Sequence, residues 1–267
     1  MSSVPYYSHG EGPVPRMRYW AAYKFVWTSR NGWTNLLLAS VCVLIPIVGV
    51  LVLIGYIRDV MLARLDTFED DSLGYPDFNF SLFGEYLQRG LWPFLVSLVA
   101  SLVVLPVIFV FVFAGFLAVS ALGHNGPLLV AAMTVLGILY FALIIGLNIL
   151  MVPLTLRAAI LEEFGPSFSW PWIKDFATRM WREIVLSILF LMVTSIPLVL
   201  VGYAMCIVGV YPAIALFTIA QWHLHFQIYR IYLSRGGAYV PPKPIAQYVP
   251  NPPGGFPVQL PPPLPRP

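Results

Sequence analysis

Two long stretches of this chain contain no charged side chain. One covers the 67 residues 90–156, and the other covers the 46 residues 184–229. Both are rich in Leu, Val, Ile and Phe, and they exceed what the core of a 267-residue soluble globule buries. The medium around them is therefore expected to be lipid, in which only helices and closed barrels satisfy their backbone groups. We predict an all-α integral membrane protein.

Four segments are long enough to cross a hydrocarbon core of about 30 Å, which takes roughly 20 helical residues. These expected spans are residues 92–119, 128–156, 184–201 and 203–228. The last two share one uncharged run, so we expect a tight hairpin with Gly202 at its corner. A further apolar segment, residues 33–57, is interrupted by Pro46 and Gly49, which break a helical ladder.

Lysine and arginine are unevenly divided among the connections between these five segments. Four lie before residue 33, three lie between residues 57 and 92, four lie between residues 156 and 184, and four lie after residue 228. The connection at residues 120–127 and the one at residue 202 have none. The positive-inside rule places the charged connections and the C-terminus in the cytoplasm. Segment 33–57 then enters the membrane and returns as a re-entrant hairpin. The alternative is a single kinked span with the N-terminus outside, because 25 residues also suffice for one crossing.

The chain contains an internal repeat. Residues 76–91 align without gaps on residues 166–181, and Pro76, Phe78 and Arg89 are identical to their counterparts. Both copies have an apolar helical stripe with charge opposite it, which is typical of a helix lying in the membrane interface. Residues 18–30 form a weaker third copy.

This pattern predicts four full spans plus a broken, re-entrant first segment. They are arranged as three repeated units, each of which consists of an interfacial amphipathic helix followed by a helical hairpin. The motif Ile-Val-Gly-Val at residues 47–50 recurs at residues 207–210, which relates the first hairpin to the last. Chance similarity among apolar segments is the alternative explanation.

Short motifs in the first half of the chain resemble those of a known family. They are Ile45-Pro-Ile-Val-Gly49, Gly55-Tyr-Ile-Arg58, an aromatic Pro-x-Phe stretch and Tyr86-Leu-x-x-Gly90. Over about residues 18–235 the chain is similar to the uncharacterised prokaryotic membrane family called domain of unknown function 4013. The resemblance implies a bacterial or archaeal plasma membrane, and it supplies no activity and no catalytic residue.

The two ends of the chain differ from the transmembrane domain expected at residues 18–235. Residues 1–17 are expected to be a disordered N-terminal tail, and residues 236–267 a proline-rich, disordered cytoplasmic tail. Twelve prolines lie between residues 238 and 267. Such a segment adopts polyproline II, which docks into aromatic grooves of partner proteins. A tail without a partner is the alternative.

Polar residues inside the apolar segments are few. Asn148 and Gln221 are expected to hydrogen-bond between helices. His223 and His225 point away from each other on a helix, so they cannot share one metal ion, and we interpret them as anchors at the membrane interface.

The acidic residues outside the spans also lack a catalytic or metal-binding pattern. Glu162 and Glu163 have no nucleophile or histidine beside them and are interpreted as a solvated helix end. The acidic stretch 66–77 lacks the spacing of a calcium loop and is interpreted as a solvated linker. We therefore expect no catalytic, cofactor-binding or metal-ligating residue, and no cofactor.

These observations favour a non-enzymatic multi-pass membrane protein that acts as a scaffold or interaction module. Its expected partners are the lipid bilayer and a cytoplasmic protein that binds the tail, and nucleic acid is not expected. The alternative is a transporter or lipid-handling protein that uses the broken segment at residues 46–49 as a ligand site. A membrane enzyme is the third hypothesis.

Overall fold

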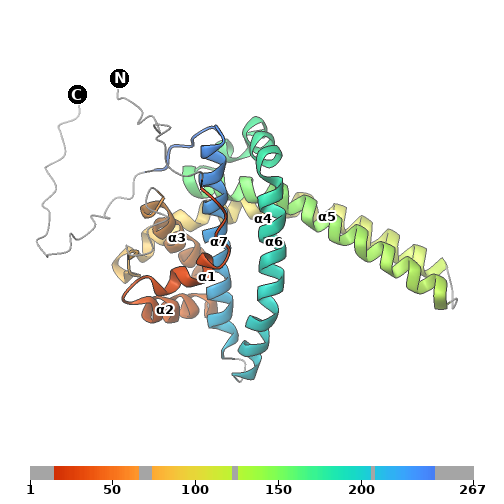
Figure 1. Ribbon diagram of the computed structural model, residues 1–267, viewed down its shortest axis with the longest axis horizontal. Coiled ribbons are helices and arrows are strands. Elements are labelled where there is room, and N and C mark those ends of the chain that lie inside the picture. The colour runs from red at the N-terminus through yellow and green to blue at the C-terminus, as the bar shows by residue number, and fades with distance from the viewer. Residues whose placement is uncertain (1–14, 66–73, 122–125, 206–207, 244–267) are drawn as a thin grey trace, which may run out of the picture.

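In the computed structural model, the described residues are 15–65, 74–121, 126–205 and 208–243, and their regular structure is all helical (Figure 1). The α-helices are α1 (Ala21–Lys24), α2 (Gly32–Leu44), α3 (Val48–Ala63), α4 (Phe83–Ala121), α5 (Gly126–Leu161), α6 (Trp170–Ala204) and α7 (Val210–Ser234). Short 3-10 turns are η1 (Phe25–Trp27), η2 (Phe80–Leu82) and η3 (Gly165–Phe168). The predicted all-α class is confirmed for these residues.

The longer helices form three consecutive hairpins, α2–α3, α4–α5 and α6–α7, and the two helices of each pair pack together. Each hairpin follows one of the short 3-10 turns. The first hairpin is the shortest, with helices of 13 and 16 residues, whereas α4 and α5 have 39 and 36 residues. The described chain therefore contains three successive helical hairpins, each preceded by a 3-10 turn.

Among the described residues, three helices are long and apolar enough to cross a membrane, judged by length and composition. They are α4 with the η2 turn, α5 and α6. Helix α7 carries most of the expected fourth span, but it is not one of these three. Its polar residues Gln221, His223 and His225 lower its hydropathy.

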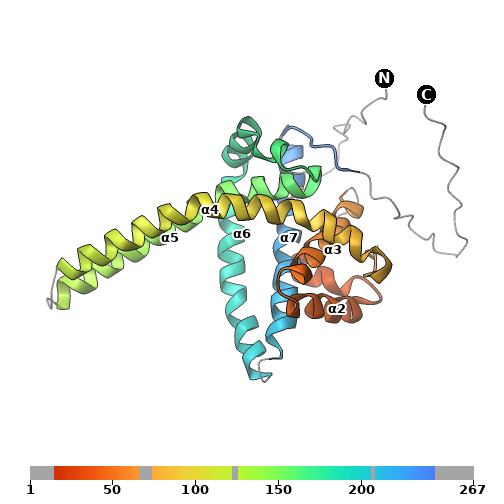
Figure 2. The same cartoon turned by 180° about the vertical axis from the view of Figure 1, so that it is seen from behind.

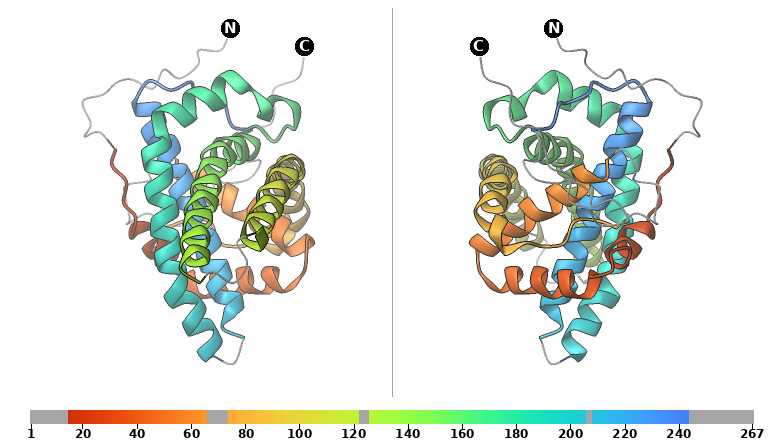
Figure 3. Two further views of the ribbon diagram at one scale, coloured as in Figure 1. Left: turned by 90° about the vertical axis from the view of Figure 1, so that its right-hand side faces the viewer. Right: turned by 90° about the vertical axis from the view of Figure 1, so that its left-hand side faces the viewer.

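Two of the hairpins extend outward from a common base, as Figures 2 and 3 show. The base contains α1, the first hairpin, the start of α4 and α6, and the ends of α5 and α7. The far halves of α4 and α5 form an apolar arm that no other described helix covers; Leu102, Phe109 and Val130 there are 61%, 68% and 66% exposed. Soluble monomers rarely expose a contiguous apolar surface of this extent.

The first apolar segment is broken between α2 and α3, as predicted. Ile47 has φ 63° and ψ −68°, and the Val48 N–H donates to the Pro46 carbonyl at 2.7 Å, which is the geometry of a strained γ-turn. After the turn, the Gly49 backbone packs closely on Cys42, whose carbonyl oxygen would lie 1.8 Å from an added Cβ atom. Helices of 13 and 16 residues measure about 20 and 24 Å, so neither alone spans a core of about 30 Å.

The turn between α6 and α7 lies later in the chain than expected. Helix α6 continues through Gly202 to Ala204, and α7 begins at Val210. A Cβ atom on Gly202 would lie 3.0 Å from the Val210 Cα atom. Glycine at this position therefore permits close packing between the two helices. The prediction that Gly202 forms the corner of the hairpin is wrong.

The amphipathic stripe of the second repeat copy packs against protein instead of lying in the membrane interface. The first part of α6 runs across the top of the base before the helix descends beside α7 (Figure 3). Phe176 and Met180 are fully buried, and Trp172 is buried as well. The ring of Phe176 lies 4.7 Å from that of Tyr232 in α7. This face is apolar because it forms part of the core of the base.

Helices α3 and α4 cross with their backbones in contact. A Cβ atom on Gly55 would lie 1.9 Å from the Tyr86 carbonyl oxygen, and one on Gly90 would lie 1.8 Å from the Leu51 carbonyl oxygen. Small residues permit such close approach between helices. The crossing also brings charged residues of the two helices together.

Replacing Gly90 by alanine should force α3 and α4 apart and destabilise the protein by about 1–3 kcal/mol, as overpacking does. Thermal unfolding of the purified protein in detergent, followed by circular dichroism, measures this change. Gly84→Ala is the matched control in the same helix, because no atom lies within 4 Å of its added Cβ. Equal unfolding temperatures for the two variants would contradict the close crossing.

Candidate functional site

Arg58 in α3 is a fully buried charged residue. Its Nη1 atom pairs with Asp59 Oδ1 at 2.8 Å, and its Nη2 atom pairs with Glu162 Oε1 at 2.7 Å. Nε donates to the Ala159 carbonyl at 3.0 Å, and Nη2 also donates to the Lys243 carbonyl at 3.3 Å. Because all three side-chain nitrogens have acceptors, the desolvation cost of the guanidinium is offset.

Arg89 in α4 joins the same group of charges. Its Nη1 atom pairs with Asp59 Oδ2, its Nη2 atom pairs with Glu85 Oε2 at 2.9 Å, and its Nε atom lies 3.8 Å from Glu162 Oε1. Asp59 and Glu162 therefore each serve both arginines. We call Arg58, Asp59, Glu85, Arg89 and Glu162 the base cluster, and it connects α3, α4 and the end of α5.

Glu162 is buried, whereas its neighbour Glu163 is exposed. The interpretation of this pair as a solvated helix end is therefore wrong for Glu162. Its φ of 53° lies in the left-handed region, where glycine is favoured after a helix and another residue costs about 1 kcal/mol or more. The ion pairs of the Glu162 carboxylate offset this backbone strain.

Sequence reasoning missed the base cluster because it used the arginines only to orient the spans. One signal was available in the repeat. Glu85 and Arg89 are four residues apart in the first copy, and Asp175 and Arg179 occupy the equivalent positions in the second. That second pair also forms an ion pair, at 2.8 Å, but the Asp175 and Arg179 side chains are 38% and 41% exposed.

Residues 238–243, which we call the strap, cross the base after α7. The Val240 N–H donates to the Tyr229 hydroxyl at 2.9 Å, and that hydroxyl lies 3.3 Å from the Val240 carbonyl, to which it donates. Trp172 Nε1 donates to the Ala238 carbonyl at 3.1 Å. Residues 238–243, which were assigned to the tail expected from residue 236, therefore dock on the base. Residues beyond 243 lie outside the described part of the chain.

His223 and His225 are both buried, so the interpretation of them as interface anchors is wrong. The His223 ring lies 4.8 Å from that of Phe25, and its Nδ1 atom lies 2.9 Å from Gln227 Nε2. Gln227 in turn bonds both backbone groups of Arg18, at 2.7 and 3.1 Å. The N-terminal segment thus packs over this part of α7.

Asn148 was expected to bond between helices, but it donates to the Ile144 carbonyl at 2.9 Å within its own helix. Gln221 is half-buried in α7, and its bond between helices stays a prediction. Thr194 in α6 bonds the Tyr23 hydroxyl at 2.7 Å, which connects α6 to α1.

Asp77 is the acidic residue of the stretch 66–77 that lies within the described residues, because residues 66–73 lie outside them. Asp77 accepts hydrogen bonds from Asn31 at 2.6 Å, Asn35 at 2.9 Å and Ser29 at 3.2 Å. It ties the loop before η2 to the start of α2. No three His, Cys, Asp or Glu side chains within the described ranges are placed to hold a metal ion.

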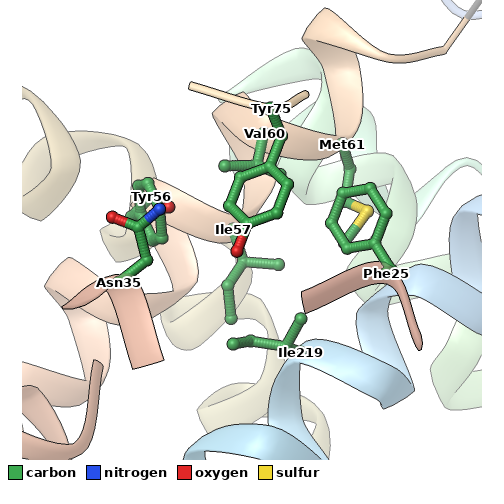
Figure 4. Close-up of a pocket in the computed structure, with 8 residues that line it drawn as sticks. All are labelled: Phe25, Asn35, Tyr56, Ile57, Val60, Met61, Tyr75 and Ile219. Atoms are coloured by element: carbon green, nitrogen blue, oxygen red, sulfur yellow. The ribbon is translucent and has the colours of Figure 1, made fainter. Parts of the chain in front are cut away.

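The core between the first hairpin and α7 contains a cavity of about 10 Å³, shown in Figure 4. Tyr75 stacks on Phe25 there, with ring centroids 4.8 Å apart, and its hydroxyl donates to the Val26 carbonyl at 2.8 Å. Burial raises the pKa of Tyr75 to about 12, so the hydroxyl keeps its proton at neutral pH. A cavity of this size holds about one water molecule and no larger ligand.

The break at residues 46–49 was the ligand site of the transporter hypothesis, which needs free backbone groups there. The Val48 N–H bonds the Pro46 carbonyl at 2.7 Å, and the Gly49 N–H bonds the Ile45 carbonyl at 3.1 Å. These two donors are therefore satisfied within the turn.

A family model described as Protein of unknown function (DUF4013) matches residues 38–208, which is more than half of the chain. The match extends from α2 to the residues after α6, so it contains all five residues of the base cluster. No curated protein matches the chain, and no solved structure does.

Replacing Glu162 by glutamine should destabilise the protein by about 3 kcal/mol, because it removes the partner of a buried guanidinium. Glu163→Gln, one residue away and exposed, is the matched control and should change stability by less than about 0.5 kcal/mol. Thermal unfolding in detergent measures both. If Glu162→Gln behaved like its control, the cluster would not hold the base together.

Proposed function

We propose that this chain, which belongs to the family described as Protein of unknown function (DUF4013), is a non-enzymatic multi-pass membrane scaffold. The arm formed by α4 and α5 carries the proposal. The most apolar stretch of each of these two helices is 0% buried within the protein, so hydrocarbon is the medium that suits it. A water-soluble chain would have to cover this surface.

The proposed topology has four full spans, which lie in α4, α5, α6 and α7, and a re-entrant first segment. The break between α2 and α3 and the short length of both helices support the re-entrant part. Phe80 and its repeat counterpart Trp170, which are 65% and 59% exposed, are suited to the headgroup region as interfacial aromatics. The C-terminus lies in the cytoplasm of a prokaryotic cell, and the membrane is the plasma membrane.

The scaffolding role rests on the base. Its charged groups bond one another and the backbone, an arrangement suited to holding three hairpins and the strap in fixed positions. The strap leads directly into the proline-rich residues from 244 onward, so the base presents this tail at one place on the membrane surface. The partners we propose are the bilayer and a cytoplasmic protein that recognises polyproline II.

The topology is tested by labelling single cysteines in intact cells with an impermeant reagent. In a Cys42→Ala, Cys206→Ala background, Gly10→Cys should remain unlabelled because the N-terminus is cytoplasmic, and Asn125→Cys should be labelled because that connection is outside. Labelling of Gly10→Cys at the level of Asn125→Cys would exclude the re-entrant hairpin.

Recruitment by the tail is tested by affinity capture with the full chain and with a chain that ends at Lys243, which keeps the strap. At least one cytoplasmic protein should be lost with the shorter chain, and alanine at residues 261–263 should also reduce it if polyproline II is recognised. Identical sets of captured proteins from all three chains would remove the recruiting role.

A further inference from the structure

A cavity of about 440 Å³ lies where the end of α5, the start of α6, the end of α7 and the strap meet. It is lined mainly by aromatic, proline and aliphatic side chains. Its charged lining residues are Arg157 and Asp175. The cavity is therefore a mostly apolar space with a small number of charged groups, which is the usual composition of a ligand site.

The Arg157 guanidinium is the charged group in this cavity that can bind an anionic ligand. Its Nε atom donates to the Pro166 carbonyl at 2.9 Å, and its guanidinium carbon lies 4.9 Å from the centre of the Trp172 ring. These two contacts hold the guanidinium in place. Within the described chain, no carboxylate lies within ion-pair distance of it, and a held guanidinium is well suited to bidentate binding of phosphate.

Asp175 does not neutralise Arg157, because its two oxygens are already engaged. Oδ1 pairs with Arg179 at 2.8 Å, and Oδ2 accepts the Tyr232 hydroxyl at 2.8 Å. Desolvation raises the pKa of the Asp175 carboxyl, but the hydrogen bonds from Arg179 and Tyr232 and the charge of Arg179 together outweigh it and lower that pKa overall. The cavity thus has one uncompensated positive charge.

Aromatic side chains near this cavity suit the level of the lipid headgroups. Phe164, Phe168 and Trp170 belong to the segment that leads from α5 into α6, and they are 38%, 38% and 59% exposed. Such side chains are enriched where hydrocarbon meets water. Arg157 also follows directly after the apolar run that forms the proposed second span, which places it at the same level.

We propose that this cavity binds the phosphate group of an anionic phospholipid from the cytoplasmic leaflet, with Arg157 as its charged ligand. The rings of Trp172 and Tyr232 and the strap then contact the apolar part of the same lipid. This inference rests on the membrane placement given under the proposed function. Lipid-headgroup sites of this kind occur in basic pockets on the cytoplasmic side of membrane proteins.

The test uses the full chain reconstituted in nanodiscs that contain equal amounts of phosphatidylglycerol and phosphatidylcholine. Native mass spectrometry measures the lipid that stays bound after extraction, and thermal unfolding measures stabilisation by each lipid. The unmodified chain should retain phosphatidylglycerol roughly tenfold over phosphatidylcholine: both lipids carry a phosphate, but the choline ammonium of phosphatidylcholine cancels its charge, so only phosphatidylglycerol brings a net negative charge to Arg157. Arg157→Gln should reduce that preference to less than about twofold.

Arg182→Gln is the matched control, because Arg182 also lies over a tryptophan, Trp181, at 5.3 Å, but does not line the cavity. It should keep the preference for phosphatidylglycerol. Ala238→Trp provides a second variant, since it fills the cavity and leaves every charge in place; it should lose the preference while circular dichroism shows an intact helical fold.

Equal lipid preference in Arg157→Gln and Arg182→Gln would overturn the inference. Stabilisation by soluble glycerol 3-phosphate equal to that by the lipid would overturn the assignment to a lipid. The proposed function fails separately, if the purified chain is monodisperse in buffer without any amphiphile. A chain that needs an amphiphile but shows no preference for phosphatidylglycerol contradicts only the lipid site.

Discussion

Burial of the Arg58 guanidinium is the constraint on which the arrangement of the base depends. An unpaired guanidinium out of water costs several kcal/mol, so a fold that buries it must bring acceptors to every nitrogen. Here the acceptors come from α3 itself, from the end of α5 and from the strap. Two hairpins and the C-terminal segment therefore converge on one side chain.

The repeat shows how one pattern of residues serves two structural roles. In the first copy, the pair Glu85 and Arg89 faces α3 and is drawn into the base cluster through Asp59. In the second copy, Asp175 and Arg179 face α7 and the residues after it, where Tyr232 and the Arg235 carbonyl are their partners. Arg89 meets another hairpin and is only 9% exposed, whereas its counterpart Arg179 is 41% exposed; the two carboxylates, Glu85 and Asp175, are exposed to a similar degree.

Much of the secondary structure followed from apolar run lengths and from Pro46. The long apolar helices and the break in the first segment are where the sequence predicts them, although α4 and α6 begin earlier than the expected spans and the last turn lies later. Two of the errors share a cause, because hydropathy reports that a side chain avoids water and does not say whether lipid or protein replaces it. The stripe that contains Phe176 and the two histidines of α7 were assigned to the membrane interface, and protein covers them instead.

The sequence by itself determined that this chain is helical, that its longest helices are too apolar for water, and that its plan repeats. Those properties are local, since they depend on the composition and period of continuous segments. The tertiary structure alone decided that Arg58 meets Glu162, that the strap docks on Tyr229, and that Arg157 borders a cavity. Each of these contacts joins residues far apart in the chain, and their pairing depends on how the helices cross in space.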